Sequence, residues 1–198
     1  LFSTLQPQTR AIKQRLFHLF SSYTLKHSFL SSNAAYNMTD ITIATHNGNF
    51  HADDVFSVAA LKYIFPSFNL VRTRDLEVIA KADIVLDVGG EYDADAGRFD
   101  HHQRGGAGER ENGIPYSSFG LIWKKYGVEI CDGNTEVAHS VDSGLVSTID
   151  AIDCGHVEGV AQGISLSQTI SMFNPTWQED GDFDACFEEA VAFASRIL

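Results

Sequence analysis

The chain has 198 residues, 44% of them hydrophobic and 20% charged, which is enough for one α/β domain with its own core. A formal net charge of −12 argues against a protein that holds nucleic acid through a broad basic surface. No run of eighteen apolar residues predicts a transmembrane helix, and three scattered cysteines indicate neither a disulfide framework nor a zinc knuckle.

Residues 1–39 differ in composition from the rest of the chain. They are rich in Ser, Leu and Phe and contain four basic and no acidic side chains, whereas the other 159 residues carry a net charge of −16. This composition is typical of a mitochondrial transit peptide, which is removed from the mature protein. The alternative is that the segment is a non-native or disordered extension and that Met38 is the initiator. We therefore expect the folded domain in residues 40–198.

From residue 41 onward, strand and helix periodicities alternate. Helices are expected at residues 53–64, 76–81, 117–126, 136–146 and 184–198. Strands are expected at residues 41–45, 69–73 and 84–88, and a further short strand ends at Phe99. Residues 84–88 are apolar apart from Asp87, which is typical of a strand buried on both faces of a sheet. The pattern predicts an α/β fold with a mostly parallel sheet flanked by helices.

Two short segments about fifty residues apart hold four of the eight histidines: THNGNFHADD (residues 45–54) and FDHHQR (residues 99–104). Between them, the apolar strand in IVLDVGG (residues 84–90) ends at Asp87. Imidazole and carboxylate groups at strand ends are what a site for two Mn²⁺ or Mg²⁺ ions requires. Ligands of open parallel sheets bind beyond the carboxyl ends of the strands, so the three segments are expected to meet at one edge.

The order of six motifs carries a resemblance to a known family. HNGNFHADD, VRTRD, DIVLDVGGEYD, FDHHQR, IDAIDCG and FNPTW resemble the MYG-type exonuclease family of the DHH phosphoesterase superfamily. The resemblance implies a DHH phosphoesterase-like fold, two divalent metal ions (Mn²⁺ or Mg²⁺) and 3′–5′ degradation of RNA. It also implies that residues 40–198 are the catalytic domain, truncated at its C-terminal end, with most of a second domain missing. If residues 1–39 are a transit peptide, the resemblance implies a mitochondrial or nuclear location, as in the family. Otherwise the protein is expected in the cytoplasm.

The resemblance also implies roles for single residues. Asp87 would bridge the two ions, with Asp54 and Asp100 behind the ligands. The last acidic ligand would be Asp150 or Asp153. Their i,i+3 spacing would put both on one helix face, so both are candidates, and Asp150 is favoured. The remaining implied ligands are His46, His51, Asp53 and His101.

The sequence departs from related enzymes at two places. His51 stands where several other DHH enzymes have aspartate, one residue later than usual, so the choice of ligands among His51, Asp53 and Asp54 stays open. Cys154 stands where the family usually has asparagine in a DNG sequence.

The substrate is expected to meet a further set of residues. His102 would donate to the phosphate or to the leaving group, and Arg104 would contact the phosphate. Arg72 and Arg74 either offset charge on the substrate or form surface ion pairs with Asp75 and Glu77. The substrate contacts implied in this way are Asn47, Arg72, Arg74, Gly89 and Gly90.

The leading hypothesis is two-metal hydrolysis of a phosphodiester, with the ions about 3.5–4 Å apart. The substrate would be single-stranded RNA or a short oligonucleotide. One alternative is a small-molecule phosphohydrolase acting on pyrophosphate or a dinucleotide, and another is a non-catalytic RNA-binding module. The sequence favours no particular oligomeric state.

Overall fold

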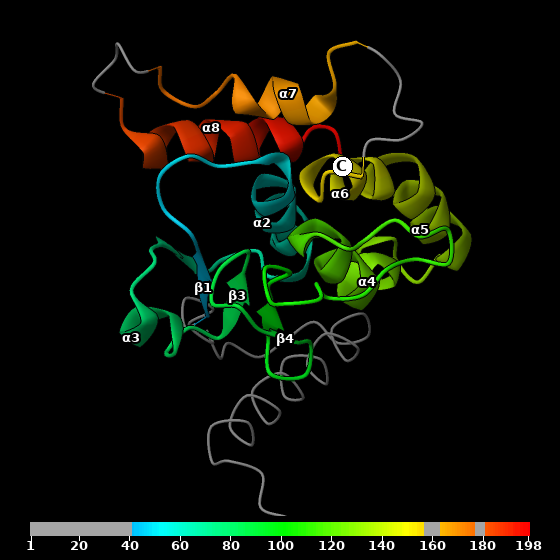
Figure 1. The fold of residues 1–198 in the computed structure, drawn as a ribbon, viewed down its shortest axis with the longest axis horizontal. Coiled ribbons are helices and arrows are strands. Elements are labelled where there is room, and N and C mark those ends of the chain that lie inside the picture. The colour runs from blue at the N-terminus through cyan, green and yellow to red at the C-terminus, as the bar shows by residue number, and fades with distance from the viewer. Residues whose placement is uncertain (1–40, 157–162, 177–180) are drawn as a thin grey trace, which may run out of the picture.

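The computed structural model describes residues 41–156, 163–176 and 181–198. The extension predicted at residues 1–39 lies outside the described residues. Five strands form one sheet in the order β2-β1-β3-β5-β4, and the helices α2, α7 and α8 lie above it in Figure 1.

The sheet is mostly parallel, as the sequence predicts. Parallel pairing joins β1 to β2 and β3, and joins β3 to β5, whereas β4 runs antiparallel to β5. The strands are β1 (Thr42–Thr45), β2 (Asn69–Arg72), β3 (Ile84–Leu86), β4 (Tyr92–Asp93) and β5 (Arg98–Phe99). The two-residue strand β4 is too short for any periodicity to predict it.

The described residues form α-helices of 4 to 13 residues. They are α2 (Ala52–Ile64), α3 (Leu76–Ile79), α4 (Ser118–Ile130), α5 (Thr135–Val141), α6 (Ser147–Asp153), α7 (Leu166–Ser171) and α8 (Phe183–Ala194). Residues 52–61 of α2 are all buried, because α2 contacts α4, α6, α7 and α8 as well as lying over the sheet. It is the central helix of the domain, which explains why its sequence is apolar on nearly every side.

The largest difference from the predicted helices concerns residues 136–146. The single helix expected at residues 136–146 is α5 followed by a π-helical turn (Asp142–Val146), and the chain continues directly into α6. Residues Asp142 to Gly144 have low helix propensity, and the hydroxyls of Ser147 and Thr148 bond back to carbonyls one turn earlier. These features favour a widened turn. The short helix α7 was not predicted.

The two faces of the sheet contact different apolar clusters. Ile43, Ile84 and Leu86 belong to the main core, which includes α2, α4 and α8. Their neighbours Ala44 and Val85 belong to a smaller cluster on the other face, which also contains Ile79, Ala82 and Val88. Because strand side chains alternate between faces, β1 and β3 are buried on both sides. This confirms the interpretation of the apolar run at residues 84–88.

No helix among the described residues combines the length and the apolar character that crossing a bilayer requires.

Candidate metal centre

The histidine and aspartate clusters meet at the carboxyl edge of the sheet. His46 follows β1, Asp87 follows β3, and Asp100 follows β5, and these three strands are neighbours in the sheet. Parallel strands bring their carboxyl ends to one edge, so segments far apart in sequence become adjacent. His46 and His101, 55 positions apart by their residue numbers, both lie within 3.3 Å of Asp87.

Asp87 lies at the centre of the cluster. Its Oδ2 is 3.1 Å from His46 Nε2, and its Oδ1 is 3.3 Å from His101 Nε2. Its backbone has a φ of 54°, a left-handed conformation that costs an aspartate about 1 kcal/mol. Such strained residues are concentrated at functional sites. Here the left-handed backbone places the Asp87 carboxylate between His46 and His101.

Asp53 and Asp54 come from the first turn of α2, and both are fully buried. Asp54 Oδ1 accepts hydrogen bonds from the N–H groups of His51 and Val55, which fixes the start of the helix. Its other oxygen, Oδ2, faces His46 Nε2 at 3.3 Å. Among the described residues, no N–H or hydroxyl group donates to either oxygen of Asp53.

The histidine rings are oriented through their Nδ1 atoms. His46 Nδ1 lies 3.2 Å from the Asn47 carbonyl oxygen, which only accepts, so Nδ1 carries the proton and Nε2 faces the carboxylates. His101 Nδ1 lies 3.8 Å from Cys154 Sγ, and its Nε2 lies 3.2 Å from Asp153 Oδ2. These contacts leave one ring nitrogen of each histidine for the cluster.

Asp100 holds the DHH segment in place. Its Oδ1 accepts from the His101 and His102 backbone N–H groups, at 2.7 and 3.1 Å, and from His102 Nδ1 at 2.8 Å. Its Oδ2 accepts from the Gly90 N–H at 2.6 Å, which joins the end of β5 to the turn after β3. His102 is 61% exposed, so its Nε2 is the ring nitrogen free to meet a substrate.

The structure separates Asp150 from Asp153, which the sequence had left as alternatives. Asp153 lies in the cluster, whereas the favoured Asp150 does not. Asp150 is fully buried and accepts hydrogen bonds from Ser117 Oγ, Gly120 N–H and Arg110 Nη1. Residues three apart on a helix point about 60° away from each other. That angle directs Asp150 toward α4 and leaves Asp153 facing His101.

A hollow of about 280 Å³ lies beside the cluster. Three of the five predicted substrate contacts, Arg74, Gly89 and Gly90, line it. Gly89 and Gly90 have φ values of 100° and 71°, which only glycine adopts easily in so tight a turn. The other lining residues are His46, His51, Asp87, Val88, Asp100 and His102.

The remaining predicted substrate residues lie elsewhere. Arg72 forms neither the expected ion pair with Asp75 nor one with Glu77. It donates instead to Asp184 and to the carbonyl oxygens of Phe183 and Gly48, and its guanidinium stacks on the Phe187 ring. Arg104 is exposed and does not line the hollow, and Asn47 is exposed and contributes its carbonyl to His46.

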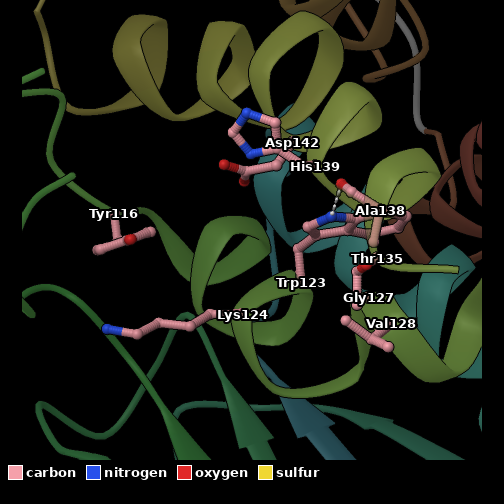
Figure 2. A pocket seen from close by; sticks show the side chains of 9 residues that line it. All are labelled: Tyr116, Trp123, Lys124, Gly127, Val128, Thr135, Ala138, His139 and Asp142. Carbon is pink, nitrogen blue, oxygen red and sulfur yellow. Dashed lines mark hydrogen bonds between the residues drawn. The ribbon is translucent and has the colours of Figure 1, made fainter. Parts of the chain in front are cut away.

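A second hollow, of about 240 Å³, lies between α4 and α5 (Figure 2). Tyr116, Trp123, Lys124 and His139 are among the residues around it, and Trp123 Nε1 donates to the Ala138 carbonyl oxygen at 3.0 Å. None of the predicted site residues lines it. The chemistry-bearing cluster therefore belongs to the first hollow.

The pKa values of the cluster reflect crowded negative charge. Burial, followed by repulsion from Asp87, raises the pKa of Asp54 to about 7, and the same two causes raise the pKa values of Asp53 and Asp153. Burial also disfavours ionised Asp87, but the adjacent imidazoles of His101 and His46 lower its pKa to about 2. Burial opposes a charge on His101, yet Asp87 and neighbouring groups raise its pKa to about 10. A cation among these carboxylates would relieve their repulsion.

The residues present fit divalent metal ions. Several buried polar atoms of the cluster have no hydrogen-bond partner: both Asp53 oxygens, Asp54 Oδ2, Asp87 Oδ1 and His101 Nε2. Ligand atoms of His46, His51 and Asp87 lie within 4.8 Å of one another, as do those of His51, Asp53 and Asp153. Asp87 also forms such groups with His101 and His102 and with Asp53 and Asp54. Carboxylate and imidazole donors suit Mn²⁺, and carboxylates suit Mg²⁺.

Sequence reasoning did not assign a role to two residues that contact this site. Cys154 was noticed only as a departure from a family motif, and its sulfur lies against His101. Asn174 was quoted only as part of FNPTW, and its side chain binds the backbone of Phe50. The motif itself was the only available signal for Asn174, because the contact spans 124 residues.

Fold and site together define an α/β protein with a histidine–carboxylate cluster suited to divalent cations. The family model MYG1_exonuc, described as "Uncharacterised protein family (UPF0160)", matches residues 42–198, so the chain belongs to this family. No solved structure matches the chain significantly.

Relatives with known names support the same assignment. The chain is 36% identical over 175 residues to "MYG1 protein C27H6.8" of Caenorhabditis elegans, covering 76% of this chain and 52% of that protein. It is 36% identical to the rat "MYG1 exonuclease" and 35% identical to the human one, covering in each case 75% of this chain and 46% of the relative. The chain thus spans about half the length of the curated relatives it matches.

Proposed function

We propose that this chain is the catalytic domain of a DHH-type phosphodiesterase that degrades RNA in the 3′–5′ direction with two Mn²⁺ or Mg²⁺ ions. The observation that carries the proposal is the position of Asp87, with one carboxylate oxygen facing His46 and the other facing His101. A carboxylate between two sets of ligands is the arrangement that a pair of ions needs. The printed name "MYG1 exonuclease" of the rat and human relatives supports a nuclease.

We assign the ligands in two groups that share Asp87. One ion would be held by His46, His51 and Asp87, with Asp53 between the two groups. The other would be held by Asp87, His101 and Asp153. His101 Nε2 lies 3.2 Å from Asp153 Oδ2. Asp54 and Asp100 would hold the ligand-bearing segments from behind.

The chain's own groups account for substrate handling. When bound, the ions would supply an activated water and offset negative charge on the phosphate. Arg74 and the turn at Gly89 and Gly90 would bind the phosphate from the hollow. His102, with Nδ1 held by Asp100, would donate a proton through Nε2 to the leaving oxygen.

The size and charge of the hollow favour a single-stranded end over a long bound segment. Its volume of about 280 Å³ lies at the lower limit for small-molecule pockets. Arg74 is the only arginine or lysine among its lining residues. A site of this kind binds one nucleotide unit, which is what an exonuclease removes, and leaves the rest of the substrate to other surfaces.

The test is hydrolysis of an end-labelled single-stranded RNA with and without Mn²⁺, in parallel with a His101→Ala variant. Stepwise shortening from the 3′ end, dependent on Mn²⁺ and absent in the variant, is the expected result. An RNA blocked at its 3′ hydroxyl tests polarity, because it should resist degradation if hydrolysis begins at that end.

The small hollow also makes a small-molecule phosphohydrolase the second candidate. Pyrophosphate and a dinucleotide therefore belong in the same assay. If either small substrate is hydrolysed and long RNA is not degraded, the protein is a small-molecule phosphohydrolase and the exonuclease proposal is wrong. RNA binding without turnover of any substrate, by folded and metal-loaded protein, would instead indicate a non-catalytic RNA-binding module.

A further inference from the structure

The loop that carries His46 and His51 is held near its end by the side chain of Asn174. Asn174 Oδ1 accepts a hydrogen bond from the Phe50 N–H at 3.0 Å, and Asn174 Nδ2 donates to the Phe50 carbonyl oxygen at 2.9 Å. One carboxamide thus pairs with both backbone groups of Phe50. Because Phe50 directly precedes His51, this pairing fixes the backbone from which the His51 imidazole extends.

The Phe50 side chain gives this contact a rigid base. Its ring is fully buried and packs edge-on against Phe187 of α8, with ring centroids 5.4 Å apart and an interplanar angle of 85°. Arg72 stacks on the Phe187 ring and donates to the Gly48 carbonyl oxygen at 2.7 Å. The loop is therefore anchored at Gly48 and at Phe50, on either side of Asn49.

Asn174 is itself placed by the end of α7. Its backbone N–H donates to the Ser171 carbonyl oxygen at 3.2 Å, in the turn that follows the helix. A primary amide offers a donor and an acceptor on two separate atoms, whereas an ionised carboxylate only accepts and a hydroxyl has a single oxygen for both roles. Asparagine has the chemistry that this double contact requires.

We propose that Asn174 is a positioning residue of the metal centre, which sets the place of His51 and thereby the affinity for divalent cations. The inference rests on the proposed function, since it takes the cluster as a metal site. Asn174 does not line the hollow, and both polar atoms of its carboxamide bind the backbone of Phe50, so it acts through Phe50. Loss of groups that orient metal ligands typically weakens metal binding about 10–100-fold.

The experiment measures Mn²⁺ affinity by calorimetry and amide hydrogen exchange at Phe50 and His51 in wild type and in Asn174→Ala. Asn134→Ala is the matched control: Asn134 Oδ1 also accepts two backbone hydrogen bonds, from Glu136 and Val137, at the start of α5. Asn174→Ala should bind Mn²⁺ about 10–100-fold more weakly and exchange faster at Phe50. Asn134→Ala should bind Mn²⁺ as the wild type does.

The outcomes separate this inference from the proposed function. Wild-type affinity in Asn174→Ala, together with faster exchange at Phe50, overturns the positioning role and leaves the metal centre intact. Equal weakening in both variants overturns it too, because the effect would then be general destabilisation. If the wild type binds no Mn²⁺, the proposed function fails and the inference fails with it.

If Asn174→Ala does not fold, a second variant that keeps one of the two hydrogen bonds to Phe50 still tests the proposal. Asn174→Asp retains the acceptor for the Phe50 N–H but repels the Phe50 carbonyl oxygen. We expect slow exchange at the Phe50 amide and a Mn²⁺ affinity between those of wild type and Asn174→Ala. Wild-type affinity in Asn174→Asp, with altered exchange at His51, would count against the proposal.

Discussion

Two acidic clusters adjoin different faces of α6, and they differ in how their carboxylates are satisfied. Around Asp150, donors from Arg110, Ser117 and Gly120 meet both oxygens, and Arg110 is held in turn by Asp142. Around Asp87 and Asp153, the carboxylates face one another and two histidines, and several of their oxygens have no hydrogen-bond partner. The first is a complete network, whereas the second leaves several carboxylate oxygens available to a cation.

The comparison teaches that burial of an acid does not by itself indicate a ligand. Asp150 and Asp153 come from the same short segment, and both have a pKa raised by burial, that of Asp150 to about 6. What distinguishes them is the supply of donors from neighbouring elements.

The largest effect is expected from Asp87→Asn. The amide cannot bridge two cations, so metal-dependent hydrolysis should fall by about 10³-fold or more, equivalent to about 4 kcal/mol of transition-state stabilisation. The measurement is the rate of hydrolysis at saturating Mn²⁺, with circular dichroism to confirm folding. Glu188→Gln, on the exposed side of α8, removes one charge as a control. A loss of less than tenfold would remove Asp87 from the reaction.

Arg110→Met should destabilise the domain by about 3 kcal/mol, because it leaves Asp150 buried and unpaired. The measurement is urea unfolding in EDTA. Adding Asp150→Asn to this variant should recover part of the loss, since the unpaired charge is then gone. Mn²⁺ affinity of the folded variant should equal that of wild type. A weakened affinity would mean that the two clusters are coupled through α6.

Gly120→Ala probes the same network by steric means. A Cβ atom at Gly120 would overlap Asp150 Oδ2, so the side chains must shift, at a cost of about 2 kcal/mol. Thermal or urea unfolding measures the effect. Gly144→Ala is the matched control, since nothing lies within 4 Å of its Cβ position, and it should be neutral or slightly stabilising. Equal effects at both positions would refute the close approach of α4 to Asp150.

Asp53→Asn, in the metal cluster, should stabilise the metal-free domain, whereas Arg110→Met and Gly120→Ala should destabilise it. Burial and the charges of Asp87, Asp153 and Asp54 disfavour an ionised Asp53, so a neutral amide should stabilise the metal-free domain by about 1 kcal/mol. The same variant should bind Mn²⁺ more weakly. Unfolding in EDTA and Mn²⁺ calorimetry give the two values. Destabilisation in EDTA would indicate that Asp53 is held by interactions like those around Asp150.

The smallest effect concerns thiol labelling. Cys154 lies against His101 and within 4.8 Å of Asp153, so bound Mn²⁺ should slow its alkylation by ordering both neighbours. Cys131 and Cys186 are internal references, and mass spectrometry gives the rate at each site. Equal slowing at all three thiols would reflect general stabilisation, and no slowing at Cys154 would place the ion away from His101.

Local patterns predicted the layers of the fold and the main segments of the site. The apolar run at residues 84–88 and the alternation of strands and helices were enough for a mostly parallel sheet, and strand ends indicated where His46, Asp87 and His101 meet. What failed depends on partners distant in sequence. Arg72 was expected at the substrate, but Asp184 and Phe187, more than a hundred residues later, hold it. The structure also places Asp150, the favoured ligand, away from the cluster, because its donors lie on α4 and on the loop before it.

The most direct test of the central claim is a crystal structure of the protein with Mn²⁺, with anomalous scattering recorded at the manganese edge. The account predicts two peaks about 3.5–4 Å apart. Asp87 should lie between them, His46 beside one and both His101 and Asp153 beside the other, with no peak at Asp150. No peak at Asp87, or a manganese ion bound by Asp150, would contradict it.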